Sequence, residues 1–187
     1  SVQSIGKGAF ANCRSIKGDL IIPDATKYIG INCFQFCSFD GNLFLGNGLE
    51  IIDEGAFDQC KSLKNKGKLN LSNHLKIIGK SAFGYCESFV GDLIIPKNVE
   101  VINSSAFYGC GFDGKLVIDN EKLTKIGASV FSSGKYKNII IGDNVTEIEE
   151  SAFMGCNQTE TIIIGKNISK IWKGAFEYCN PQKFIIK

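Results

Sequence analysis

Cysteines are the side chains of this 187-residue chain best suited to chemistry, because a thiol can form a disulfide, ligate zinc or act as a nucleophile. Seven of the eight end a short block that opens with Ile: Cys13, Cys37, Cys60, Cys86, Cys110, Cys156 and Cys179. No pair has the CxxC spacing typical of zinc sites. Side chains that repeat along a stack run parallel and do not point at one another. We therefore expect free thiols that act as small apolar core residues, with a disulfide framework as the alternative.

Other candidates for catalysis are few. The single histidine, His74, lies in the predicted turn SNHLKII without a nucleophile or orienting group at a matching spacing. Carboxylates such as Asp53, Glu54, Glu149 and Glu150 lie where short helices are expected to begin, a position that favours acidic residues. The sequence contains no phosphate-binding GxxxxGK[ST] loop. We expect no enzyme activity, no cofactor and no metal.

Charge and hydropathy exclude two further classes. The 21 basic and 19 acidic residues give a net charge of +2, and Arg14 is the only arginine, so binding of nucleic acid is not expected. No apolar run approaches the ~18 residues that a membrane span needs, so we expect no membrane span in this fragment.

An internal repeat organises the chain. The block Ile-Gly-x-x-Ala-Phe-x-x-Cys recurs with small changes from Ile5, Ile29, Ile52, Ile78, Ile102, Ile126, Ile148 and Ile171, at intervals of 22 to 26 residues. The Phe position does not vary; it is filled by Phe10, Phe34, Phe57, Phe83, Phe107, Phe131, Phe153 and Phe176. Such constancy predicts a solenoid of about eight coils, because each coil buries its apolar edge against an equivalent edge.

Each repeat also contains a short β-rich run: DLIIP at Asp19, NLFLG at Asn42, KLNLS at Lys68, DLIIP at Asp92, KLVID at Lys115, NIIIG at Asn138, TIIIG at Thr161 and FIIK at Phe184. These runs predict one short parallel strand per coil. The segment from Ile to Cys is expected to form a helical turn or two with Ala and Phe facing inward. The predicted architecture is therefore an α/β solenoid.

The IGxxAFxxC block followed by LxIPxxV resembles the BspA-like class of leucine-rich repeats, and the resemblance extends from Ile5 to the end of the chain. It departs from the commoner leucine-rich pattern in having Cys where that pattern has an Asn rung. The resemblance implies a right-handed, curved solenoid of the kind found in bacterial and protist surface proteins that adhere to cells and matrix proteins.

Strand alternation separates core residues from a candidate binding surface. In DLIIP, Leu20 and Ile22 share the inward face and Ile21 points outward. The equivalent outward positions, expected on a concave face, are Ile21, Phe44, Asn70, Ile94, Val117, Ile140, Ile163 and Ile185. Seven of these eight are apolar, where a solvated sheet would have polar residues. We call these eight residues the apolar stripe and predict that it binds a protein partner.

These features predict a protein-binding or adhesion module, cell-surface or secreted, whose partner by resemblance is a host matrix or cell-surface protein. A passive structural spacer and an intracellular scaffold are the alternatives, and the thiols do not decide the compartment. We expect residues 1–187 to form a single leucine-rich repeat domain, a fragment of a longer array, whose open ends favour self-association.

Overall fold

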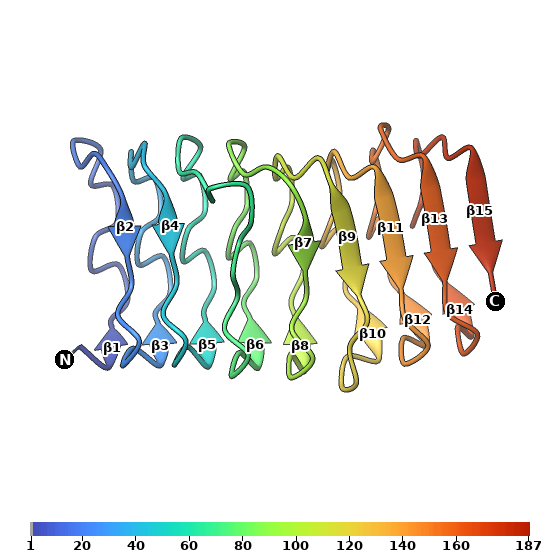
Figure 1. Ribbon diagram of the computed structural model, residues 1–187, viewed down its shortest axis with the longest axis horizontal. Helices are drawn as coiled ribbons and strands as arrows, with labels where there is room; N and C mark the ends of the chain where they lie inside the picture. Colours follow the sequence, from blue (N-terminus) through green and yellow to red (C-terminus); the bar gives the residue numbers. More distant parts are fainter. Residues whose placement is uncertain (1) are drawn as a thin grey trace.

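The computed structural model describes residues 2–187 and contains eight coils stacked side by side in one direction (Figure 1). The N-terminus and the C-terminus lie at opposite ends of the stack. Equivalent positions of successive coils therefore lie next to one another, as the repeat predicts. The solenoid architecture is confirmed.

Two ladders of parallel strands run the length of the stack. Ladder A contains β2 (Leu20–Ile21), β4 (Leu43–Phe44), β7 (Leu93–Ile94), β9 (Lys115–Ile118), β11 (Asn138–Ile141), β13 (Thr161–Ile164) and β15 (Lys183–Ile186). Ladder B contains β1 (Ser4–Ile5), β3 (Tyr28–Ile29), β5 (Ile51–Ile52), β6 (Ile77–Ile78), β8 (Val101–Ile102), β10 (Lys125–Ile126), β12 (Glu147–Ile148) and β14 (Lys170–Ile171). The sequence predicts ladder A but not ladder B, which uses the Ile that opens each block and the residue before it.

Register follows the repeat. In ladder A, Ile140 of β11 pairs with Val117 of β9 and with Ile163 of β13. In ladder B, Ile52 pairs with Ile29 and with Ile78. Because equivalent residues pair, the inward residues of successive strands lie in rows that are buried in the middle of the stack.

The predicted short helices are wrong: residues 2–187 contain no helix, and the segment from Ile to Cys is a series of turns. Two positions in each block have a positive φ, such as Asn32 at 53° and Phe36 at 58°. Left-handed residues interrupt a helix after a few residues. The backbone N–H groups bond to the next coil instead, as Phe34 N–H does to the Ala56 carbonyl at 2.8 Å.

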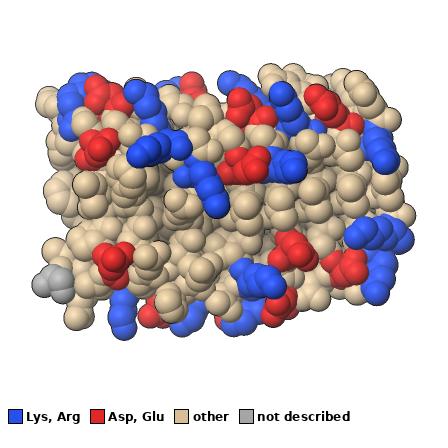
Figure 2. Space-filling model, viewed as in Figure 1, with Lys and Arg blue, Asp and Glu red and all other residues tan. Residues whose placement is uncertain are grey.

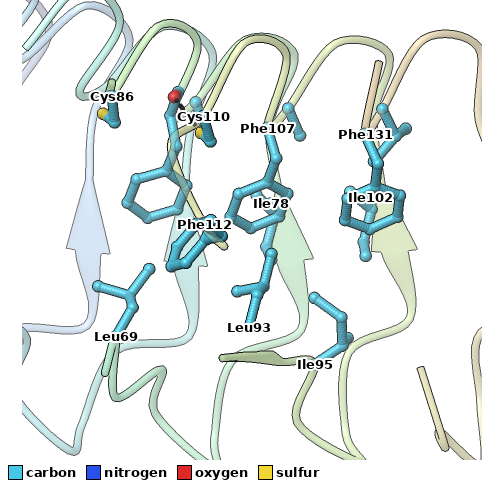
Figure 3. Packing of buried hydrophobic residues seen from close by; sticks show 14 of the residues in the cluster. Leu69, Ile78, Cys86, Leu93, Ile95, Ile102, Phe107, Cys110, Phe112 and Phe131 are labelled. Carbon is cyan, nitrogen blue, oxygen red and sulfur yellow. Dashed lines mark hydrogen bonds between the residues drawn. The ribbon is translucent and has the colours of Figure 1, made fainter. Parts of the chain in front are cut away.

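The core holds one phenylalanine per coil in a single stack. Neighbouring rings from Phe10 to Phe176 lie nearly parallel, with centroids 5.0 to 5.7 Å apart. Figure 3 shows Phe107 and Phe131 in this row, with the inward Leu93 of ladder A below Phe107. Aromatic pairs at such distances contribute about 0.5–1.5 kcal/mol beyond their buried area. The predicted aromatic rungs are confirmed.

Cysteines form a second row beside the phenylalanines. The Cys60 Sγ donates to the Phe34 carbonyl of the preceding coil at 3.0 Å, and the Cys110 Sγ donates to the Phe83 carbonyl at 3.0 Å. Cys37, Cys86, Cys156 and Cys179 make the same bond. The thiol therefore fills a small space and satisfies a carbonyl of the turn, which explains the choice of Cys over Ala.

Each ladder is interrupted once, in both cases where the sequence is longer than in the other coils. Ladder A breaks between β4 and β7, because residues 68–71, predicted as a strand, form none. The stretch from Cys60 to Leu69 is two residues longer than that from Cys86 to Leu93. Ladder B breaks between β8 and β10. Ten residues separate Leu116 from Ile126, whereas nine separate Leu93 from Ile102.

Candidate functional site

The apolar stripe lies on the outward face of ladder A. Ile21 is 68% exposed, Ile94 43% and Phe44 39%, whereas the inward Leu93 is fully buried. Asn70 is also exposed, and the members from β9 onward are half-buried: Val117, Ile140, Ile163 and Ile185. The outward orientation agrees with strand alternation. Partner binding by these residues stays a prediction.

The stripe is not continuous. Pairing brings Ile21 beside Phe44, and a second run joins Ile94, Val117, Ile140, Ile163 and Ile185 in consecutive strands. Asn70 lies in the break of ladder A and pairs with neither β4 nor β7. Its insertion-bearing coil therefore divides the surface into a short part and a long part.

Polar residues flank the stripe and are partly engaged by the backbone. Asp19 Oδ1 accepts the Asn42 N–H at 2.7 Å, and Asp92 Oδ1 accepts the Lys115 N–H at 2.7 Å. Figure 2 shows an uncharged band along this face with charged side chains above and below it. An apolar floor with a polar rim is the usual composition of a protein interface.

A groove at the break was not predicted from the sequence. It has a volume of about 460 Å³ and is lined by Leu45, Lys68, Leu71, Ile94 and Pro96 among others. A smaller hollow of about 160 Å³ shares Leu45, Lys68 and Asn70 with it and is also lined by Lys66. The available signal was the interval of 26 residues between Ile52 and Ile78, the longest in the repeat. We call the two hollows together the coil-3 groove.

The acidic residues considered above do not lie at helix starts, because residues 2–187 contain no helix. Asp53 accepts a hydrogen bond from the Tyr28 hydroxyl at 2.7 Å. Glu149 accepts one from the Ala128 N–H at 2.9 Å and lies 2.6 Å from the Lys125 ammonium. These carboxylates join neighbouring coils. The expectation that the helix dipole places them is wrong.

The thiols and the histidine have surroundings that explain them without catalysis. All eight cysteines are free. Burial raises the pKa of Cys33 to about 11 and that of Cys60 to about 12, so both are protonated at neutral pH. His74 lies in an exposed turn with its Nδ1 2.9 Å from the Asn47 carbonyl. Within residues 2–187, no cluster of three or more His, Cys, Asp or Glu side chains is arranged to hold a metal, and no helix is long and apolar enough to cross a membrane.

Parallel coils with rows of inward strand residues and repeated core rungs define a leucine-rich repeat solenoid. The chain belongs to the BspA type of leucine-rich repeat region, whose family model matches residues 1–113 and 76–187 with six copies. The resemblance seen in the repeat motif is confirmed.

Three solved structures are similar to this chain. A leucine-rich repeat protein from Bacteroides ovatus is 26% identical, with a TM-score of 0.53, and the match covers 100% of this chain and 59% of that one. The pneumococcal vaccine antigen PcpA is 16% identical, with a TM-score of 0.40 and coverage of 100% and 66%. A leucine-rich cell surface protein from Faecalibacterium prausnitzii is 17% identical, with a TM-score of 0.33 and coverage of 95% and 75%. No curated protein matches at a significant level.

Proposed function

We propose that this chain is a non-enzymatic protein-binding and adhesion module of a cell-surface or secreted protein. Its partner is a matrix or cell-surface protein, held on the outward face of ladder A. Membership of the BspA-type repeat family supports a role in protein interaction. The observation that carries the proposal is the apolar stripe, because Ile94, Ile140 and Ile163 occupy outward positions where an unpartnered sheet has polar residues.

The experiment replaces Ile94, Ile140 and Ile163 with Thr, which keeps the β-branched shape and removes apolar surface. Binding of the purified chain to a panel of immobilised extracellular-matrix and cell-surface proteins is measured by surface plasmon resonance. We expect at least a tenfold loss of affinity for each partner that the unsubstituted chain binds.

A matched control carries Ile77→Thr and Val101→Thr, which change outward residues of ladder B. This variant is expected to bind like the unsubstituted chain, and circular dichroism checks that both variants fold. Unchanged binding by the folded ladder A variant, or an equal loss in both variants, contradicts the proposal.

A further inference from the structure

The coil-3 groove exists because the chain leaves the strand path. Lys66 and Gly67 have consecutive positive φ values of 49° and 79°, which turn the inserted residues into a loop. Asn65 lies buried beneath this loop, where its amide donates to the Val90 carbonyl at 2.8 Å and accepts the Val90 N–H at 3.1 Å. The side chain of Asn65 thus ties the displaced loop to the next coil.

The displacement leaves backbone groups without ladder partners. In regular coils, Ile22 N–H donates to the Phe44 carbonyl at 2.8 Å and Ile95 N–H to the Val117 carbonyl at 3.0 Å. The equivalent donors, Leu45 N–H and Leu71 N–H, make no backbone bond to the Asn70 and Ile94 carbonyls. All four of these residues line the groove. Unpaired backbone groups favour a ligand that supplies a complementary N–H and C=O.

The side chains around the groove place two further requirements on a ligand. Leu45, Leu71, Ile94 and Pro96 form an apolar part of the lining, beside the polar side chains of Asn47, Asn70 and Asn73. Among the residues lining the two hollows, the charged ones are Lys66 and Lys68, both basic and exposed.

The basic side chains near the groove are not held in ion pairs, although Lys68 lies in register with Asp92 of the next coil. Lys64, Lys66 and Lys68 take part in none of the ion pairs of the described residues. Figure 2 shows basic side chains over the region between β4 and β7. A ligand that fits carries an apolar side chain and a carboxylate close to it.

We propose that the coil-3 groove binds an extended, acidic peptide segment of the protein partner. An apolar side chain of the segment contacts Leu45, Leu71 and Ile94, and its backbone bonds to the unpaired N–H and C=O groups. Its carboxylates lie beside Lys66 and Lys68. This inference rests on the proposed function and names the part of the partner that enters the surface.

The test selects linear 12-residue peptides from a random phage-displayed library on the intact 187-residue chain. The enriched peptides are expected to carry Asp or Glu beside an apolar residue. The most enriched peptide is synthesised with a fluorescent label and its affinity measured by polarisation. A variant with Lys66→Glu and Lys68→Glu, which changes two exposed residues, is expected to bind this peptide at least tenfold more weakly.

One control tests whether the position of the charge change matters, and a second tests whether the peptide backbone bonds to the groove. Lys135→Glu with Lys173→Glu makes the same change of charge on exposed residues that do not line the groove, and is expected to alter affinity less than twofold. N-methylation of alternate peptide bonds, which removes backbone donors, is expected to cost at least tenfold. A lack of acidic enrichment, or equal binding by both charge variants, overturns the inference.

The Ile140→Thr and Ile163→Thr changes distinguish this inference from the proposed function. These positions lie three and four coils from coil 3, so the peptide is expected to keep its affinity. If the variant with Ile140→Thr and Ile163→Thr loses partner binding and the variant with Lys66→Glu and Lys68→Glu keeps it, the inference about the groove is wrong and the proposed function is supported. Peptide binding at the groove with full partner binding in the Thr variants overturns the proposed function instead.

Discussion

At the scale of single residues, the cysteine row links stability to pH. Burial raises the pKa of Cys33, Cys60, Cys86 and Cys110, and the Phe carbonyls hold the protonated thiols of the last three. An unfolded chain releases the same protons near pH 8.5. Stability is therefore complete below about pH 8.5 and falls as the pH rises through 9 toward 12.

The free energy of unfolding is expected to fall by about 1.4 kcal/mol per pH unit for each buried thiol, at pH values where the thiols of the unfolded chain are ionised. Urea denaturation at pH 7, 9, 10 and 11 measures it. Replacing Cys60 and Cys110 with Ala is expected to lower the free energy of unfolding at pH 7. The same change is expected to make that free energy fall less steeply with pH, because two buried thiols no longer contribute. An equal slope in both proteins would show that the thiols do not control the transition.

The one coil without a cysteine shows how two residues compensate each other. Gly134 takes the Cys position, and a Cβ there would lie 2.2 Å from Cε2 of Tyr136. Tyr136 is fully buried, and its hydroxyl has no hydrogen-bond partner. In the preceding coil the equivalent pair is Cys110 with Phe112, both buried. The ring of Tyr136 therefore fills the space that the thiol occupies elsewhere.

This compensation predicts a coupling measurable in a double-mutant cycle. Gly134→Cys alone is expected to destabilise by about 1–3 kcal/mol through overpacking. Tyr136→Phe alone removes an unpaired buried hydroxyl and is expected to be near neutral or stabilising. The double variant is expected to recover most of the loss, because a ring without the buried hydroxyl can shift to the position that Phe112 takes one coil earlier and leave the introduced thiol space to donate to the Phe107 carbonyl. Additive effects in chemical denaturation would contradict the coupling.

At the scale of elements, the break in ladder B creates a local weak point. Thr146 N–H and Glu149 N–H donate to the Thr124 and Ile126 carbonyls at 2.8 and 2.9 Å. One coil earlier, Thr124, Lys125 and Gly127 N–H make no such bonds to Glu100 and Ile102. A cleft of about 260 Å³ lies at this point.

Hydrogen exchange measured by NMR is expected to be fast for the amides of Thr124, Lys125 and Gly127. These amides are unbonded and can exchange without local unfolding. Their equivalents one coil later, Thr146, Glu147 and Glu149, are hydrogen-bonded and are therefore expected to be protected. The comparison is internal, since both sets come from the same ladder of one sample. Equal protection of the two sets would mean that the ladder is closed in solution.

The sequence predicts those parts of the molecule that repeat. The constant Phe position and the alternation in DLIIP identify the core and ladder A, because equivalent residues must pack on each other. The helices were wrong because residues such as Ser81 and Tyr85, whose types do not favour a positive φ, adopt one here; Gly55 and Gly109 at the equivalent positions of neighbouring coils were the available signal. The coil-3 groove was missed because an insertion marks a change in the chain path without showing its direction.

At the scale of the whole molecule, contacts between coils are local, so the stack behaves as a one-dimensional array. Each strand of either ladder pairs only with strands of adjacent coils. Stability is then a sum of coil and interface contributions, and a complete coil is a removable unit.

Deletion of residues 103–126 tests this directly, because it joins Ile102 to Gly127 in the same register as the native Ile126. The deletion also removes the long loop between β9 and β10. The strand that follows β8 in ladder B is then β12, which is preceded by the loop of regular length after β11. We expect a folded chain with a continuous ladder B, protected amides at Thr146 and Glu149, and a urea m-value lower by roughly one-eighth. Deletion of residues 103–114 removes half a coil and is expected to leave an unfolded array, because inward residues of later coils no longer align. Folding of both deletions to the same extent would refute the one-dimensional description.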